Sequence, residues 1–288
     1  VEVTPLAGGF WSAAFAFRHQ GSEFVVRFNE NAEGFQIDQA ACAFAATGLP
    51  VPEVHEIGTA LGLSYAISTR HHGRFLELAE PDEARRLAPA LADMFARMRR
   101  VPRREQVEWY KPDSRSSWHD YLRRGLDEDT GARADGWRAA LHSRPKLHDL
   151  YLAACDRIRA LLPLCPERRD LVHGDLLHQN VLISDRADSI EAVFSWKCSA
   201  FGDFAYDIAW CSHWAPWHPG IAAIDFLALT LDSDDLDEGA RQHLGERHHC
   251  YQLQIATSHI GWYLWTRDEA NLDLLTRGLR RNLAQGPR

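Results

Sequence analysis

The segment from His173 to Asn180, which reads His-Gly-Asp-Leu-Leu-His-Gln-Asn, is the feature that most constrains the fold of this chain. It lies between two short apolar runs that favour strands, Leu171-Val172 before it and Val181-Leu182-Ile183 after it. The pattern therefore predicts a polar loop between two strands. Because Asp175 and Asn180 stand five residues apart on this loop, it can direct a carboxylate and an amide to one point.

This pairing of side chains matches the needs of phosphoryl transfer. A carboxylate must accept the proton of the acceptor hydroxyl, and an oxygen ligand must hold the Mg²⁺ that neutralises the phosphates. We expect His173 to anchor the loop by packing and hydrogen bonding. The spacing H-x-D-x-x-x-x-N is also that of the protein-kinase catalytic loop. A chance polar turn between strands is the alternative, and the placement after a helix and between two strands favours the catalytic interpretation.

In the rest of the chain, the predicted secondary structure changes from strands near the N-terminus to helices further on. Predicted strands lie at 15–18, 24–28, 54–58 and 63–68, and predicted helices lie at 38–47, 83–99 and 148–162. The segment from Phe204 onward is predicted to be helical apart from a break at 214–220. The sequence thus predicts an α+β fold, with a small β-rich lobe followed by a larger helical lobe.

Composition narrows the classes of function. Hydrophobic residues make up 45% of the 288 residues and charged residues 25%, as in ordinary globular proteins. The net charge of −8 disfavours nucleic acid as a partner and suits a cationic ligand. No apolar run approaches the roughly 20 residues of a membrane span, and the N-terminal residues lack the pattern of a signal peptide. With six scattered cysteines, we expect a cytoplasmic protein that carries reduced thiols.

The loop also resembles that of a known family. His-Gly-Asp followed by Asn five residues after the Asp is similar to the catalytic loop of the aminoglycoside phosphotransferases, which are protein-kinase-like small-molecule kinases. Protein kinases carry Arg where Gly174 stands. The likeness is greatest to members that phosphorylate hygromycin, and it extends to Ala14–Phe17, Val26–Asn29, Glu33–Phe35, Leu49–Val54, Ile57-Gly58 and Phe201–Asp203.

The resemblance covers about residues 6–217 and implies a bilobal protein-kinase-like fold. Residues 1–70 would form the nucleotide-binding lobe. Residues 71–288 would form the helical lobe, which carries the catalytic loop and the acceptor site.

The resemblance implies roles for individual residues. Asp175 is the expected general base, and Asn180 is the expected magnesium ligand. Arg27 stands where the family usually has the lysine that holds the α- and β-phosphates, and an arginine can bind phosphate through two hydrogen bonds. Asp38 is either the carboxylate that orients Arg27 or the N-cap of the predicted helix, and both roles are compatible.

Two further segments resemble nucleotide contacts. Residues 8–12 resemble the phosphate-binding loop, which places Gly9 and Ser12 at the nucleotide, although two glycines before a strand are also typical of a simple turn. Ser68 and Arg70 resemble the hinge whose backbone pairs with adenine. ATP and GTP both stay open as the nucleotide, because a hinge reads the base through backbone atoms.

Ser195 departs from the family pattern. The family has a Mg²⁺-chelating Asp before a Trp, whereas this chain has Ser195 before Trp196. A neutral hydroxyl is a poor replacement, because a hard cation prefers charged oxygen ligands. Three interpretations stay open: an impaired kinase, a binding protein on a kinase scaffold, or a site in which another carboxylate such as Asp203 supplies the charge, the last being the least favoured.

The acceptor site is the least defined part. The resemblance makes Asp203 and Asp207 candidates for binding a cationic acceptor, although in the family a carboxylate at either position can instead brace the catalytic loop. Trp214 is a candidate for stacking on a sugar, although most tryptophans of a helical region belong to the core.

The predicted function is transfer of the γ-phosphate of ATP or GTP, with Mg²⁺, to a hydroxyl of an aminoglycoside-like, hygromycin-type molecule by a monomer. The alternatives are a kinase of another alcohol (choline-like, homoserine-like or macrolide) and a pseudokinase that binds its ligand without turnover. Antibiotic resistance and a housekeeping role both stay open.

Overall fold

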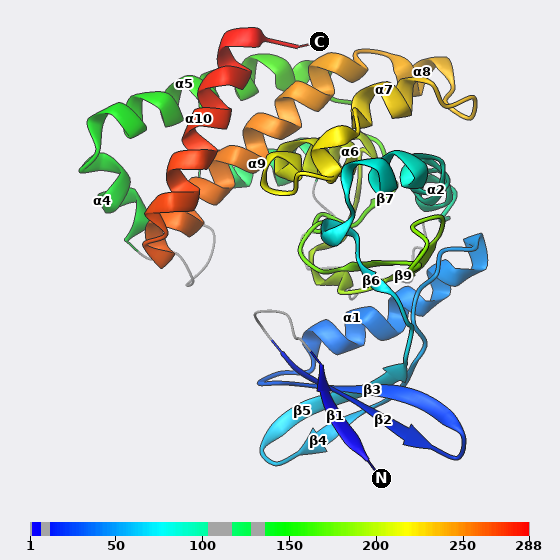
Figure 1. The fold of residues 1–288 in the computed structure, drawn as a ribbon. Helices are drawn as coiled ribbons and strands as arrows, with labels where there is room; N and C mark the ends of the chain where they lie inside the picture. The colour runs from blue at the N-terminus through cyan, green and yellow to red at the C-terminus, as the bar shows by residue number, and fades with distance from the viewer. Residues whose placement is uncertain (1, 7–11, 103–116, 128–135, 288) are drawn as a thin grey trace. The chain divides into compact units, whose positions relative to one another are not determined.

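The computed structural model describes residues 2–6, 12–102, 117–127 and 136–287 (Figure 1). The chain divides into two compact units. The first consists of Val1–Pro112, Asp170–Phe201 and Trp214–Asp225, and the second of Asp113–Arg169, Gly202–His213 and Phe226–Arg288. The catalytic-loop segment therefore belongs to the same unit as the N-terminal strands. The expected lobe boundary at residue 70 does not coincide with this division and stays a prediction.

The first unit contains a five-stranded antiparallel sheet in the order β1-β2-β3-β5-β4 (Figure 1). Its strands are β1 (Val3–Leu6), β2 (Ala13–His19), β3 (Ser22–Asn29), β4 (Val54–Ala60) and β5 (Leu63–Thr69). The four predicted strands are confirmed as β2, β3, β4 and β5. Strands β2 and β3 form a hairpin, since His19 pairs with Ser22 around the Gln20-Gly21 turn.

Helix α1 (Glu33–Ala41) packs on this sheet through Phe35, which forms a buried cluster with Val54 and Ala66. A 3-10 helix, η1 (Cys42–Thr47), continues it. The helix begins at Glu33 rather than at the predicted Asp38, so Asp38 lies in the middle of α1. The N-cap interpretation of Asp38 is therefore wrong, and its buried carboxylate serves other partners.

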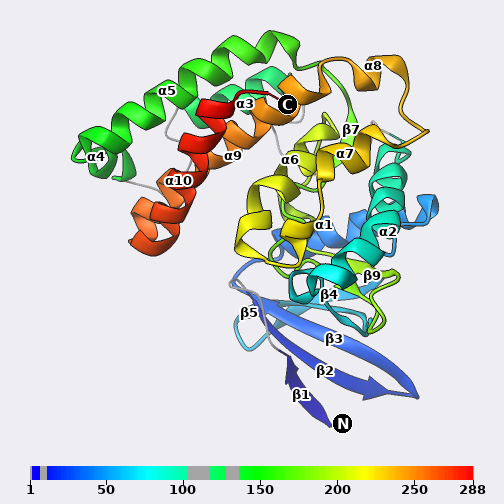
Figure 2. The same cartoon turned by 45° about the horizontal axis from the view of Figure 1, so that its top comes forward.

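The first unit also contains a three-stranded sheet of order β6-β8-β9. In sequence, β6 precedes the predicted catalytic loop, and β8 and β9 follow it. The strands of this sheet are β6 (Arg74–Phe75), β8 (Val181–Ile183) and β9 (Ile190–Val193), while β7 (Asp170–Val172) precedes the loop and β10 (Ala200–Gly202) follows this sheet in sequence. The predicted helix at 83–99 is confirmed as α2 (Pro81–Arg99), which contacts β7 and β9 (Figure 2). Its periodic apolar residues are buried, as expected for a core face: Leu87, Leu91, Met94, Phe95 and Met98.

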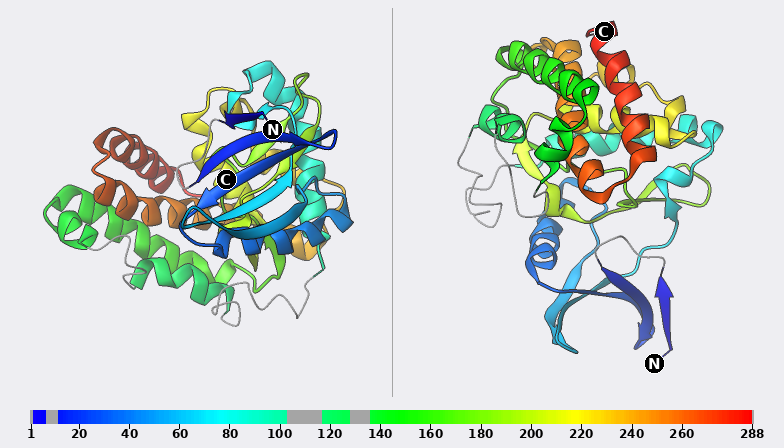
Figure 3. Two further views of the ribbon diagram at one scale, coloured as in Figure 1. Left: turned by 90° about the horizontal axis from the view of Figure 1, so that it is seen from below. Right: turned by 90° about the vertical axis from the view of Figure 1, so that its left-hand side faces the viewer.

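The second unit is helical. Its helices are α3 (Trp118–Asp127), α4 (Trp137–His142), α5 (Pro145–Leu161), α6 (Ala205–Trp214), α7 (Phe226–Leu231), α8 (Glu238–Arg241), α9 (Leu244–Thr266) and α10 (Glu269–Gln285), with the last residue of α6 assigned to the first unit. Helix α9 packs against both α5 and α10 (Figure 3). Among the described residues, no helix combines the length and the apolar character that crossing a membrane requires.

Candidate active site

His173 anchors the catalytic loop. Its ring is fully buried and lies 4.6 Å from the ring of Trp196, measured between centroids. The backbone N–H of Asp175 donates to Nδ1 at 3.2 Å, so the ring proton is on Nε2, which donates to the carbonyl oxygen of Phe194 at 3.1 Å. Burial lowers the pKa of His173 and favours this neutral form.

Asp175 and Asn180 meet as the spacing of the motif predicts. The Nδ2 group of Asn180 donates to the carbonyl oxygen of Asp175 at 2.7 Å and to its carboxylate Oδ2 at 3.0 Å. The other carboxylate oxygen, Oδ1, lies 2.5 Å from Nδ1 of His178. Both oxygens of the expected base are thus oriented by neighbours on its own loop. The Asp175 side chain keeps 24% of its surface exposed, so it is still accessible to an acceptor.

Gly174 lies at a position in the loop that leaves no room for a side chain. Its φ is +72°, and an added Cβ would lie 2.9 Å from the carbonyl oxygen of Cys198. The absence of a side chain thus lets the loop and the 196–198 turn approach each other.

We expect Gly174→Ala to destabilise the fold by about 1–3 kcal/mol, because it combines an unfavourable φ with a steric clash. Thermal melts measure this loss. Gly62→Ala is the matched control, because Gly62 has a φ of +76° and nothing within 4 Å of an added Cβ. If both variants lost the same stability, the close approach at Gly174 would carry no cost.

Asp38 connects the sheet to the segment that contains Ser195. Its Oδ2 accepts from Nη2 of Arg27 at 2.6 Å, and its Oδ1 accepts from the backbone N–H of Trp196 at 2.8 Å. The Arg27 guanidinium also lies over the Phe35 ring, 5.2 Å from its centroid. A carboxylate therefore orients Arg27, as the resemblance implies.

The candidate metal ligands lie on neighbouring segments. The N–H of Phe194 donates to the carbonyl oxygen of Asn180 at 3.1 Å, which brings the next residue, Ser195, close to the loop. Ser195 has the left-handed backbone angles φ +67° and ψ +55°. The side chains of Asn180 and Ser195 offer only neutral oxygens, whereas Mg²⁺ is usually bound through one or two carboxylates.

The described residues contain no group of three or more His, Cys, Asp or Glu side chains able to hold a metal ion. The oxygens of Asp175 are already engaged by His178 and Asn180. The residues present therefore do not fit a divalent cation.

Of the other predicted nucleotide contacts, those that the structure describes lie in the main sheet or next to one of its strands. Gly9 falls outside the described residues, and Ser12 directly precedes β2. Ser68 is buried in β5. The N–H of Arg70 donates to the carbonyl oxygen of Glu23 at 3.1 Å, and its Nη1 lies 3.7 Å from Oε1 of Glu23. These contacts fix the end of β5, where the expected hinge begins.

Asp203 is committed to the core of the second unit. It is fully buried, and its two oxygens accept from Nε and Nη2 of Arg247 at 2.8 and 2.5 Å. Oδ2 also accepts from the Tyr251 hydroxyl at 2.7 Å. Because these bonds use both oxygens, Asp203 has no oxygen left to bind a cationic acceptor. Asp207 on α6 is 1% exposed and is therefore inaccessible to an acceptor.

Trp214 belongs to the same unit as the catalytic loop. Its ring packs edge-on against His178, with 4.9 Å between centroids, and against Trp217 at 5.0 Å. Since His178 also contacts Asp175, an aromatic cluster begins next to the expected base. Trp214 is itself only 3% exposed, so its ring packs within this cluster and is as inaccessible to an acceptor as Asp207.

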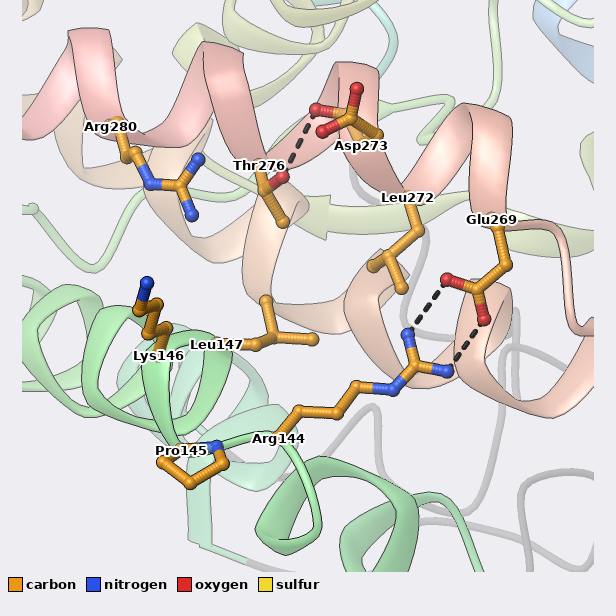
Figure 4. Close-up of a pocket in the computed structure, with 9 residues that line it drawn as sticks. All are labelled: Arg144, Pro145, Lys146, Leu147, Glu269, Leu272, Asp273, Thr276 and Arg280. Atoms are coloured by element: carbon orange, nitrogen blue, oxygen red, sulfur yellow. Dashed lines mark hydrogen bonds and ion pairs between the residues drawn. The ribbon is translucent and has the colours of Figure 1, made fainter.

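A separate hollow of about 510 Å³ lies between the start of α5 and α10 (Figure 4). Arg144 and Glu269 form a two-bonded ion pair across it, with 2.8 and 2.6 Å between their atoms. None of the predicted site residues lines this hollow, so we assign it no role in the reaction.

Comparison with known proteins decides the family. A sequence profile of the phosphotransferase enzyme family matches residues 2–241, most of the chain. The chain belongs to the phosphotransferase enzyme family. Its sequence is 30% identical over 229 residues to the hygromycin-B 4-O-kinase of Escherichia coli. That match covers 75% of this chain and 63% of the relative, which is less than two thirds of the relative's length.

Solved structures of phosphotransferases share the fold. The crystal structure of aminoglycoside phosphotransferase APH(4)-Ia has a TM-score of 0.75 at 23% identity, and the match covers 100% of this chain and 94% of that one. A thermostable mutant of the same enzyme has been solved in a ternary complex with AMP-PNP and hygromycin B. It has a TM-score of 0.77 at 23% identity, and the match covers 98% of this chain and 93% of that one. The predicted family and the predicted kinase-like α+β fold are both confirmed.

Two residues of the site were not predicted from the sequence. His178 lies within the motif, so its position in a catalytic loop was a usable signal. Glu77, which accepts a hydrogen bond from the loop at Gln179, is distant in sequence, and no local pattern marks it.

Proposed function

We propose that this protein transfers the γ-phosphate of a nucleoside triphosphate to a hydroxyl of an aminoglycoside-like molecule. The observation that carries the proposal is the loop centred on Asp175, whose carboxylate is partly exposed and held on both oxygens. The family membership and the likeness to a hygromycin-B kinase support the substrate class. The net charge of −8 suits a cationic acceptor.

The residues of the candidate site have separate roles in this reaction. Asp175 accepts the proton of the acceptor hydroxyl as the hydroxyl oxygen attacks the γ-phosphorus; the bond from the γ-phosphorus to the β–γ bridging oxygen breaks, and the nucleoside diphosphate leaves. Asn180 and His178 hold the carboxylate in place. Arg27, oriented by Asp38, holds the phosphates of the nucleotide through charge-assisted hydrogen bonds.

Ser195 favours a second candidate function, which is nucleotide binding without turnover. The position that the resemblance assigns to a metal-binding carboxylate has a neutral hydroxyl. A site of this kind keeps the nucleotide contacts of Arg27 and lacks the charge that holds the cation.

Incubation with γ-labelled ATP or GTP and a panel of aminoglycosides, with choline, homoserine and a macrolide as comparison acceptors, separates the candidates. Labelled aminoglycoside is the expected product. If calorimetry detected nucleotide binding but no acceptor became labelled, the phosphotransferase proposal would fail in favour of the binding protein.

Removing the charge of Arg27 should weaken nucleotide binding. A hydrogen bond to a charged group contributes about 1.5–3 kcal/mol, so we expect Arg27→Ala to raise the Kd of ADP roughly 10- to 100-fold. Arg27→Lys should recover part of this loss, since it keeps the charge without the two-bonded geometry. Arg85→Ala on α2 is the control, because its exposed side chain pairs with Asp82 on the same helix and touches none of the predicted nucleotide contacts. An unchanged Kd in Arg27→Ala would remove Arg27 from the phosphate site.

A further inference from the structure

Glu77 reaches the catalytic loop from a distant part of the sequence. It lies in the 3-10 helix η2 (Leu76–Leu78), which directly follows β6 and is anchored by the buried side chain of Leu76. Strand β6 pairs with β8, so that Phe75 lies opposite Leu182. This register brings Glu77 to the end of the loop, where its Oε1 accepts the backbone N–H of Gln179.

Gln179 is the one non-glycine residue of the 173–180 loop with a positive φ. Its φ is +63°, in the left-handed region that residues other than glycine seldom adopt. The next residue is Asn180, whose amide group binds both the carbonyl and the carboxylate of Asp175. The backbone conformation at Gln179 therefore sets where Asn180 stands relative to Asp175.

The position of the Glu77 carboxylate is unfavourable for Glu77 itself. Its Oε2 is buried and has no hydrogen-bond partner among the described residues. Burial also raises the pKa of Glu77, because the charged form is deprived of water. Leu76 already provides the packing of this turn. The bond to Gln179 is the strongest of the contacts that offset the burial of the carboxylate.

We propose that Glu77 is a positioning residue for the reaction, which holds Gln179 in its left-handed conformation and thereby fixes Asn180 and Asp175 for proton transfer. This inference rests on the proposed function. It does not place Glu77 in contact with the acceptor or the nucleotide.

Two variants of similar size test the role of the hydrogen bond. Glu77→Gln keeps an oxygen that can accept the Gln179 N–H, and Glu77→Met fills the same space without an acceptor. Hydrogen exchange over residues 176–183 is measured in both folded proteins, together with kcat, KM for the nucleotide and the melting temperature. Glu30→Ala, an exposed substitution, is the control.

We expect Glu77→Met to speed exchange in this segment and to lower kcat roughly 10- to 100-fold, with KM little changed, because displacement of reacting groups costs rates of this order. Glu77→Gln should match the parent in both measurements. Parental exchange and kcat in Glu77→Met, or equal losses in the two variants, would overturn the inference. If Glu77→Met did not fold, losses of exchange protection and kcat in folded Glu77→Gln would overturn it, and parental values would support it.

Hydrogen exchange is measured without turnover, so failure of the Glu77 proposal can be distinguished from failure of the proposed phosphotransferase function. A parent that labels no acceptor would refute the proposed function, whereas faster exchange in Glu77→Met alone would still support the bracing of the loop.

Discussion

Asp175→Asn should lower kcat by about 10²- to 10⁴-fold, the contribution typical of a general base. The amide has the shape of the carboxylate but cannot accept the proton of the attacking hydroxyl. Its oxygen can still accept from Asn180, and His178 can change tautomer to accept from the new amide group. The loop should therefore keep its fold, and the variant should melt close to the parent temperature while KM for the nucleotide stays nearly unchanged.

Asp185→Asn is the matched control, because Asp185 is an exposed residue on the turn after β8. The same chemical change there should leave kcat unaltered. A kcat of Asp175→Asn within a few-fold of the parent would show that another group accepts the proton. A large rise in KM at parental kcat would instead assign Asp175 to substrate binding.

The loop at 173–180 was predictable because its signals are local. Polar residues between two apolar runs mark the loop, and the spacing within it places Asp175 beside Asn180. The strands of the main sheet were predictable for the same reason, since aromatic and β-branched residues flank turns such as Gln20-Gly21. These features depend on neighbours in sequence, which a single chain displays directly.

The remaining contacts join residues that the sequence keeps apart. Asp38 binds the N–H of Trp196 from the middle of a helix, and Glu77 binds Gln179 through the pairing of β6 with β8. Such bonds depend on how elements pack, so composition and periodicity carry no mark of them. The start of α1 was misplaced for a related reason: burial of Phe35 against the sheet extends the helix toward Glu33.

The burial of Asp203 shows the same limit of sequence-based prediction for the acceptor site. Its partners are Arg247 and Tyr251 on α9, far along the chain. A carboxylate for a cationic substrate and a carboxylate for a buried arginine look alike in sequence. Only the three-dimensional contacts separate these two roles.

Ser195→Asp should raise kcat by about 10²-fold or more, since one well-placed electrostatic group typically contributes a factor of this size. The new carboxylate would stand beside Asn180 and give a divalent cation the charged oxygen that it prefers. The backbone at Ser195 is left-handed, and aspartate tolerates this conformation better than most residues. The substitution should therefore be accommodated without loss of the turn.

Calorimetry with ADP, in the presence of Mg²⁺ or of a chelator, measures the same change without turnover. We expect nucleotide binding to the parent to depend weakly on Mg²⁺, and binding to Ser195→Asp to depend on it strongly. Ser195→Asn is the matched control, because it has the size of aspartate and tolerates the same backbone conformation but carries no charge. It should behave as the parent does.

The opposite result would be equally informative about the site. If the parent already turned over at about 1–100 s⁻¹, the range typical of kinases, and Ser195→Asp changed neither this rate nor the Mg²⁺ dependence, a carboxylate at position 195 would be irrelevant to the cation. The assignment of Ser195 as the replaced metal ligand would then be wrong. The charge would have to come from the nucleotide phosphates or from a carboxylate elsewhere, because the Asp175 oxygens are held by His178 and Asn180.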